Sequence, residues 1–173
     1  MQKRSENSAA IKRKYPEPII LVIVKDKHGK YNPVPCSWAM VASGEPLMFA
    51  FALSGKRYSL EAIRRAGEFV ISFPSESMQD EVAYYGSCSG DNTDKFKEKP
   101  LLTEKAESID SLILTDSVAN FECVLECEHS AGDHIIIFAR VLKSWENQDA
   151  SLKRLFNVGS GRKLSGCSTT EKK

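Results

Sequence analysis

A chain of 173 residues is long enough for one domain with its own hydrophobic core, without disulfide or metal cross-links. Lys plus Arg number 24 and Asp plus Glu 23, a formal net charge of +1, which argues against a protein held mainly by nucleic-acid phosphates. No apolar run approaches the ~20 residues of a membrane-spanning helix, and the polar N-terminus lacks the apolar segment of a secretory signal. We therefore expect a single-domain cytoplasmic protein with no nucleic-acid or membrane partner.

The residues 1–14 are polar and basic, and we expect a flexible tail that ends where two prolines restrict the backbone. Beyond it, short apolar and β-branched runs predict strands, and Gly29 allows the positive φ of a hairpin turn between the first two. The predicted strands span residues 19–24, 31–40, 47–53, 69–73, 121–129 and 134–144.

Short helices are expected between and after these strands. Ser59 has the side chain of an N-cap, and Gly67 can end the helix that follows it. The predicted helices span residues 59–66, 77–84 and 151–156.

The order of the elements favours an antiparallel barrel with helical decoration over a parallel sheet, because hairpins join most strands. Several strands are apolar on both faces, whereas the strands of a sheet with one solvent-exposed face would carry polar residues on that face. One face would fill the barrel, and helices or a second subunit must cover the other, so we expect a homodimer. Residues 15–158 would form this domain, and a flexible Gly/Ser/Lys-rich tail, 159–173, would follow it.

The five cysteines predict neither a disulfide framework nor a zinc ribbon, because they are scattered, odd in number and include no CxxC pair. Cys123 and Cys127 are the closest pair, but on the strand predicted there they would lie roughly 13 Å apart. The histidines His28, His129 and His134 form no metal-spaced pair within one element. We therefore expect no metal site.

Three places carry residue types suited to a bound ligand. Residues 54–59 put Lys56 and Arg57 between a glycine and a helix start, which suits a phosphate; the alternative is an ordinary capped helix after a basic turn. Residues 32–39 put Trp38 after two prolines, where backbone groups could meet a planar heterocycle; the alternative is a core tryptophan. Residues 85–96 form a long polar segment, which could equally be a solvated surface loop. No recognised catalytic motif is present.

Four sequence blocks, in this order and spacing, extend the three places into one pattern over residues 15–145. They are Tyr15-Pro16-x-Pro18 with the hairpin after it, Ser37-Trp38 with the turn after it, Arg57-Tyr58-Ser59-x-x-Ala62-Ile63, and Tyr85-Gly86-x-x-Ser89-Gly90-x-x-x-Asp94-Lys95-Phe96. This pattern resembles the FMN-binding split-barrel proteins of the flavin reductase-like family, most closely their flavoredoxin-like branch. The likeness implies a six-stranded antiparallel Greek-key split barrel, usually a homodimer, with FMN at the barrel edge near the subunit interface.

Carried over position by position, the resemblance implies three groups of cofactor-binding residues. The flavin ring would be lined by Asn32, Ser37, Trp38, Ala39, Leu53, Ser54 and Gly55. The phosphate would be held by Lys56, Arg57 and Ser59. The site would be closed, from the same chain or from the second subunit, by Ser89, Gly90, Asp94, Lys95 and Phe96. His134 would sit near the nicotinamide or flavin ring, and it is the candidate catalytic residue. The C-terminal residues 159–164 depart most from the family pattern.

The resemblance implies an FMN-dependent oxidoreductase that passes electrons from NADH or NADPH through FMN to free flavin, iron, a protein partner or another acceptor. Two alternatives keep the flavin without turnover, namely an electron carrier of the flavoredoxin type and a flavin-storage module. A further alternative is a barrel with no flavin. If the phosphate site is right, Arg57→Ala or Lys56→Glu should weaken FMN binding.

Overall fold

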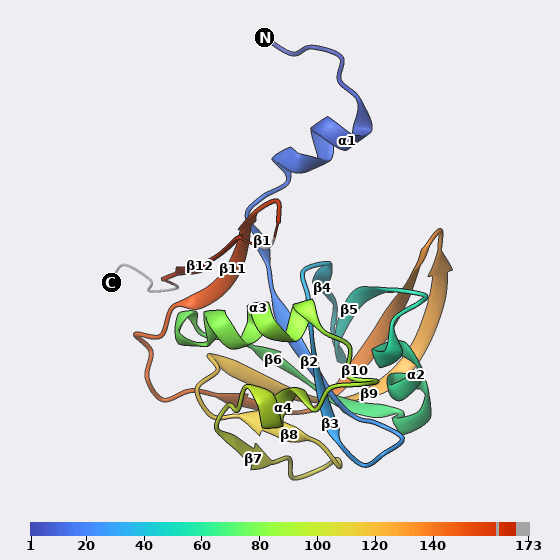
Figure 1. Cartoon of the computed structure of the whole chain (residues 1–173), viewed down its shortest axis with the longest axis vertical. Coiled ribbons are helices and arrows are strands. Elements are labelled where there is room, and N and C mark those ends of the chain that lie inside the picture. The colour runs from blue at the N-terminus through green and yellow to red at the C-terminus, as the bar shows by residue number, and fades with distance from the viewer. Residues whose placement is uncertain (162, 169–173) are drawn as a thin grey trace.

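The computed structural model describes residues 1–161 and 163–168. Its centre is an antiparallel sheet with the strand order β3-β2-β6-β9-β10-β5-β4 (Figure 1). The seven strands are β2 (Ile20–Lys25), β3 (Tyr31–Cys36), β4 (Ala39–Gly44), β5 (Leu47–Ser54), β6 (Glu68–Phe73), β9 (Ala119–Ala131) and β10 (His134–Glu146). The expected mainly β, antiparallel fold with short helices is confirmed.

The predicted strand over 31–40 is in fact two strands, which is why the sheet has seven members. β3 pairs with β2, whereas β4 pairs with β5, so the two consecutive strands form opposite edges of the sheet. Ser37 and Trp38 carry the chain from one edge to the other, and the Ala52 N–H donates to the Trp38 carbonyl at 2.9 Å. This crossing curls the sheet into a barrel.

The core explains why the first long strand is apolar on both faces. Val22 of β2 packs in the barrel interior with Phe51 and Phe69. Leu21 and Ile23 point the other way, where they pack beneath Val82 of the helix α3 (Gln79–Ser87). The outer face of this strand is therefore covered by the chain's own helix.

The helix α2 (Tyr58–Ala66) ends as predicted, because Gly67 takes the left-handed conformation with φ 69°. Its start differs from the prediction. Arg57 is the N-cap, and Ser59 lies buried in the first turn, where its Oγ accepts a hydrogen bond from Asn32 Nδ2 at 3.1 Å. The contact with Asn32, which only the tertiary structure creates, thus decides the role of Ser59.

The other helical elements are short. α3 begins two residues later than predicted, after the 3₁₀ turn η2 (Glu76–Met78). The polar segment expected as a loop contains the end of α3 and the beginning of the helix α4 (Lys95–Glu98). A two-stranded sheet of β7 (Thr103–Lys105) and β8 (Leu112–Leu114) follows. No helix in the described parts of the chain combines the length and apolar character needed to span a membrane.

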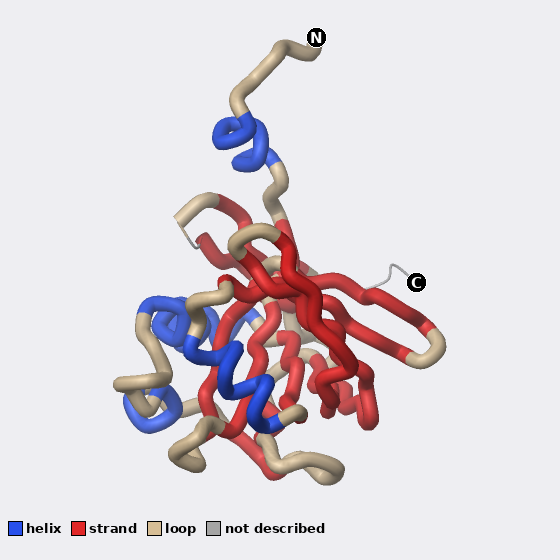
Figure 2. Tube along the Cα trace, turned by 90° about the vertical axis from the view of Figure 1, so that its right-hand side faces the viewer, coloured by secondary structure: helices blue, strands red, loops and turns tan. Residues whose placement is uncertain are grey.

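The two ends of the chain differ most from expectation. The segment expected as a flexible tail contains α1 (Asn7–Ala10) and the 3₁₀ turn η1 (Ile11–Arg13), which stand away from the barrel as an exposed arm (Figure 1, Figure 2). The short strands β1 (Glu17–Pro18), β11 (Arg154–Gly159) and β12 (Lys163–Cys167) form a third sheet.

The helix predicted over 151–156 is therefore wrong, because β11 occupies the second half of that range and pairs with both β1 and β12. The flexible tail predicted over 159–173 is wrong for the residues of β12. Residue 162 and residues 169–173 lie outside the described residues. Local propensity did not reveal these strands, and one partner of β11, the strand β1, lies at the start of the domain.

Candidate functional site

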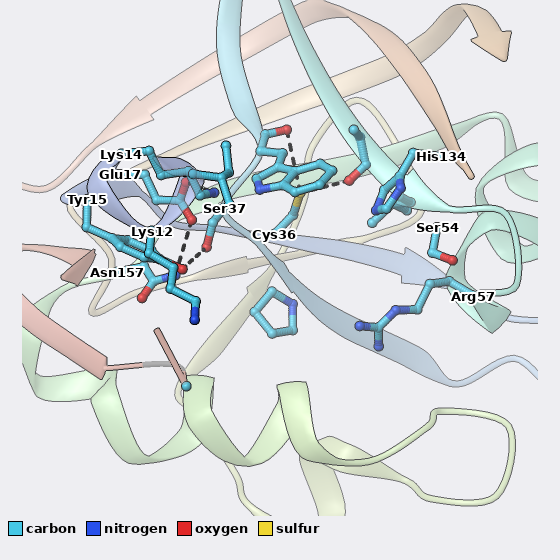
Figure 3. A pocket seen from close by; sticks show the side chains of 16 residues that line it. Lys12, Lys14, Tyr15, Glu17, Cys36, Ser37, Ser54, Arg57, His134 and Asn157 are labelled. Atoms are coloured by element: carbon cyan, nitrogen blue, oxygen red, sulfur yellow. Dashed lines mark hydrogen bonds and ion pairs between the residues drawn. The ribbon is translucent and has the colours of Figure 1, made fainter. Parts of the chain in front are cut away.

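A cavity of about 570 Å³ lies where β3 passes to β4 (Figure 3). Its walls come from the arm, the strand crossing, the end of β5, the start of α2, the start of β10 and β11. They include Lys12, Lys14, Glu17, Cys36, Ser37, Trp38, Leu53, Ser54, Arg57, His134 and Asn157. A volume of this size is ordinary for a small-molecule or cofactor site. A smaller cavity of about 90 Å³ shares Ser37, Arg57 and Asn157 with it and extends toward α3.

One wall of the cavity is an aromatic pair. The Trp38 and His134 ring centroids are 4.6 Å apart at an interplanar angle of 33°, and half of Trp38 remains exposed. His134 Nδ1 lies 2.7 Å from Asp133 Oδ1, and this hydrogen bond lowers the pKa of the Asp133 carboxyl. This contact fixes the orientation of the imidazole ring at the cavity wall. Trp38 therefore lines the cavity, and the alternative prediction of a core tryptophan is wrong.

Arg57 forms another wall. Its backbone N–H donates to the Ser54 carbonyl at 3.0 Å, which fixes the turn that leads into α2. The guanidinium points into the cavity, and within the described chain it forms no ion pair or hydrogen bond (Figure 3). The site thus has a cation at a helix start, where backbone N–H groups also favour anions.

The neighbours of Arg57 in the sequence lie elsewhere. Lys56 is exposed and does not line the cavity. Gly55 packs against the β9–β10 turn, where its N–H donates to the Asp133 carbonyl at 3.2 Å. Of the basic pair predicted to hold a phosphate, the structure places only Arg57 at the cavity.

A hydrogen-bonded group joins β1, the strand crossing and β11. Asn157 Nδ2 donates to Glu17 Oε1 at 3.2 Å and to Ser37 Oγ at 3.4 Å. These two bonds orient the amide, so its Oδ1 points away from Glu17. That oxygen is buried and has no hydrogen-bond partner among the described residues. A buried acceptor without a donor is costly, which makes Asn157 a candidate ligand contact.

Cys36 also borders the cavity, but as a buried thiol. Its Sγ donates to the Ala52 carbonyl at 3.3 Å, and burial raises its pKa to about 11. It stays protonated near neutral pH, so it is a poor nucleophile.

The block 89–96, expected to close over the flavin, packs against β3 and α3 and does not line the cavity of the single chain. Lys95 is buried, and its ammonium donates to the Pro33 carbonyl at 2.9 Å and the Tyr85 carbonyl at 2.8 Å. Burial lowers its pKa to about 8. Phe96 packs edge-on against Tyr85, with ring centroids 5.7 Å apart. These side chains support the strand that carries the site.

The remaining predicted residues are also placed outside the cavity. A Cβ on Gly90 would lie 2.2 Å from Asn32 Oδ1, so only glycine fits beside this buried asparagine. Asp94 caps α4 by accepting from the Lys97 N–H, and the exposed Ser89 accepts from the Asp91 N–H at 3.3 Å. Ala39 borders a different cavity on the far side of the strand crossing.

Sequence reasoning missed the residues that the two chain ends supply. Lys12 and Lys14 belong to the segment expected as a tail, and Asn157 follows the segment expected as a helix. A local signal existed for the lysines, since basic residues come directly before the first proline of the domain. None existed for Asn157, whose partner Glu17 is 140 residues away. The described residues contain no cluster of His, Cys, Asp or Glu side chains placed to hold a metal ion.

Comparisons with known proteins agree with this geometry. Residues 12–163 match the model of the flavin reductase like domain. Over 111 residues the chain is 34% identical to the reductase subunit HsaB of a flavin-dependent monooxygenase from Rhodococcus jostii, covering 61% of this chain and 51% of that protein.

Two solved structures share the fold. An FMN-binding protein from Thermus thermophilus superposes with a TM-score of 0.84 at 24% identity, covering 100% of this chain and 99% of that one. The flavoredoxin of Desulfovibrio vulgaris superposes with a TM-score of 0.84 at 21% identity, covering 99% and 97%. The expected split-barrel architecture is confirmed.

Proposed function

The chain belongs to the flavin reductase-like domain family, and from that premise we propose that it is an FMN-binding oxidoreductase. In this proposal it passes electrons from NADH or NADPH through FMN to a flavin, iron or another small-molecule or protein acceptor. When bound, FMN supplies the redox chemistry, and the protein supplies binding, orientation and electrostatics.

The residues of the cavity fit FMN. Arg57 has no counter-ion among the described residues and lies at the start of α2, which suits a phosphate. Asn157 Oδ1 is a buried acceptor without a donor, and the flavin ring carries an N–H of the kind that this oxygen lacks. The Trp38–His134 pair offers flat aromatic surface beside Leu53. A charged end and an apolar, aromatic remainder match a phosphorylated heterocycle.

Each of these side chains has a definite task in the proposal. Arg57 and the first N–H groups of α2 hold the phosphate, and the Ser54 hydroxyl adds a polar contact. The indole of Trp38 excludes water from one side of the ring site. His134, oriented by Asp133, offers an imidazole for proton transfer at the ring site.

The observation that carries the proposal is the juxtaposition of Arg57 with the Trp38–His134 pair in one cavity. The test is an anaerobic titration of the FMN-reconstituted protein, followed by flavin absorbance. Bleaching by NADH or NADPH is the expected result. If only dithionite bleaches the bound flavin, the protein is an electron carrier; if FMN does not bind, the proposal fails.

We also propose that the protein pairs with a second copy of itself through the face around β4. This strand is an edge of the sheet, and Met40 and Val41 on it are 63% and 61% exposed. They border an apolar cavity of about 380 Å³ that also contains Arg154, whose Nε has no hydrogen-bond partner among the described residues. A carboxylate from a second copy would supply the missing anion. An apolar edge with an uncompensated cation suits a protein surface better than water.

A further inference from the structure

Lys12 of η1 lines the same cavity as Arg57 but belongs to the exposed arm. Figure 3 shows the two side chains on opposite sides of the cavity, both directed into the space between them. Lys12, like Arg57, has no ion pair or hydrogen bond to its side chain within the described part of the chain.

The other charged groups at the cavity are already compensated. Lys14 is ion-paired with Glu17, and His134 is hydrogen-bonded to Asp133. Two uncompensated positive charges therefore remain, at opposite walls of one concave site. A cleft lined by one sign of charge concentrates ligands of the opposite sign. Two cations of this cavity are thus available to anionic groups of a ligand.

A single FMN supplies only one of these. Its phosphate fits Arg57 best, because the nine-residue helix α2 begins there and adds backbone N–H donors. Lys12 sits in a three-residue turn with no comparable donors. Lys12 is therefore available to an anionic group of another ligand of the same site.

We propose that Lys12 binds a phosphate group of the nicotinamide dinucleotide, which makes the N-terminal arm part of the reductant site. The inference rests on the proposed function, since it needs FMN at Arg57. Two phosphate groups could be the one bound, namely the diphosphate common to NADH and NADPH or the additional phosphate of NADPH. A lysine at this position favours phosphate-bearing reductants over neutral electron donors.

The test uses two redox-inert fragments, ADP-ribose and 2′-phospho-ADP-ribose, titrated calorimetrically into the FMN-loaded full chain. FMN affinity is measured first, by quenching of flavin fluorescence. Lys12→Ala should leave FMN affinity within about twofold and weaken at least one fragment about tenfold, the size of a lost charge-assisted contact. Lys12→Glu should weaken it further. Lys3→Ala is the matched control, because Lys3 belongs to the same arm and does not line the cavity.

The outcomes separate the possibilities. Equal losses for both fragments assign Lys12 to the diphosphate, and a loss for the 2′-phosphorylated fragment alone assigns it to the extra phosphate. Three results would overturn the inference: Lys12→Ala leaves the affinity for both fragments unchanged, it weakens FMN binding and not fragment binding, or the wild-type protein binds neither fragment. A wild-type protein that binds neither fragment can still bind FMN and be reduced, so the proposed function survives that last result. Failure of the wild type to bind FMN removes both.

Discussion

The chain between Cys36 and Val41 borders two cavities of opposite character. Residues 36–38 line the first, together with the cations of Lys12 and Arg57. Residues 39–41 line the second, whose walls are apolar apart from Arg154. One strand crossing therefore separates a charged, partly aromatic cavity from an apolar one. The contrast teaches that adjacent residues of one segment can line cavities of opposite character, because the bend at Ser37 and Trp38 turns them to different sides.

The largest expected effect is on the apolar side. Met40→Asp combined with Val41→Asp would put two carboxylates into the proposed interface, so the dissociation constant of the dimer should rise at least about 1,000-fold. Light scattering across a protein dilution series measures it. Leu102→Asp is the control, since Leu102 is 68% exposed and borders neither cavity. A monomeric wild type, or a double variant that stays dimeric, contradicts the proposed interface.

The next prediction concerns Lys95, a cation outside both cavities. Burial lowers its pKa from 10.5 in the unfolded chain to about 8 in the fold. The unfolded state therefore binds more protons between these values, and the free energy of unfolding should rise with pH there, by about 3 kcal/mol in all. Below pH 8 the lysine is charged in both the folded and the unfolded state, so the full free-energy cost of burying the charge is present.

Lys95→Met removes this titration, so urea unfolding at several pH values should show its stability gap to the wild type change by about that amount. FMN affinity should stay unchanged, because Lys95 does not line the cavity. A stability gap that does not change with pH would contradict the lowered pKa of Lys95. If a folded Lys95→Met variant bound FMN more weakly, Lys95 would have to be part of the flavin site.

The third prediction addresses the charged cavity. Arg57→Ala should weaken FMN binding by about 2 kcal/mol, or roughly 30-fold, because a charge-assisted contact to the phosphate is lost. Lys56→Ala is the matched control, and it should change the affinity little, since this neighbouring cation is turned away. Fluorescence titration of FMN measures both. Equal effects of the two substitutions would mean that charge density alone, and not the cavity geometry, binds the phosphate.

The smallest effect is expected at Arg154. Its guanidinium stacks 3.9 Å from the Phe73 ring centroid, and burial lowers its pKa. At protein concentrations where the wild type is monomeric, Arg154→Met should raise the free energy of unfolding by about 1 kcal/mol, because an uncompensated cation leaves an apolar wall. At concentrations where the wild type is dimeric, the same substitution should weaken the dimer. Destabilisation of the monomer, or an unchanged dimer, would show that the cation has no missing partner.

Much of the fold followed from local patterns. Two-sided apolar runs predicted buried strands such as β2 and β5, and Gly29 and Gly67 marked a turn and a helix end, which the structure confirms. The alternation over 121–129 predicted β9. These succeed because periodicity and positive φ are properties of the segment itself.

The candidate site was only partly predictable. Ser37, Trp38, Leu53, Ser54, Arg57 and His134 were named from the sequence and do line one cavity. The block ending in Lys95 and Phe96 was expected beside them, but in the single chain it packs behind β3. A sequence motif records that residues matter together, and it does not record whether they touch a ligand or hold the strand that does.

By itself, the sequence determined a mainly β, antiparallel domain of the flavin reductase-like family with a cation at the start of α2. Only the tertiary structure decided that the chain bends at Ser37 and Trp38, that β11 and β12 replace a helix and a tail, and that Lys12 and Asn157 join the site. The physical reason is distance along the chain. The hydrophobic period of a segment is a local property. The residues that pair with the segment as a strand, or join it in the wall of a cavity, can lie as far as 140 residues away.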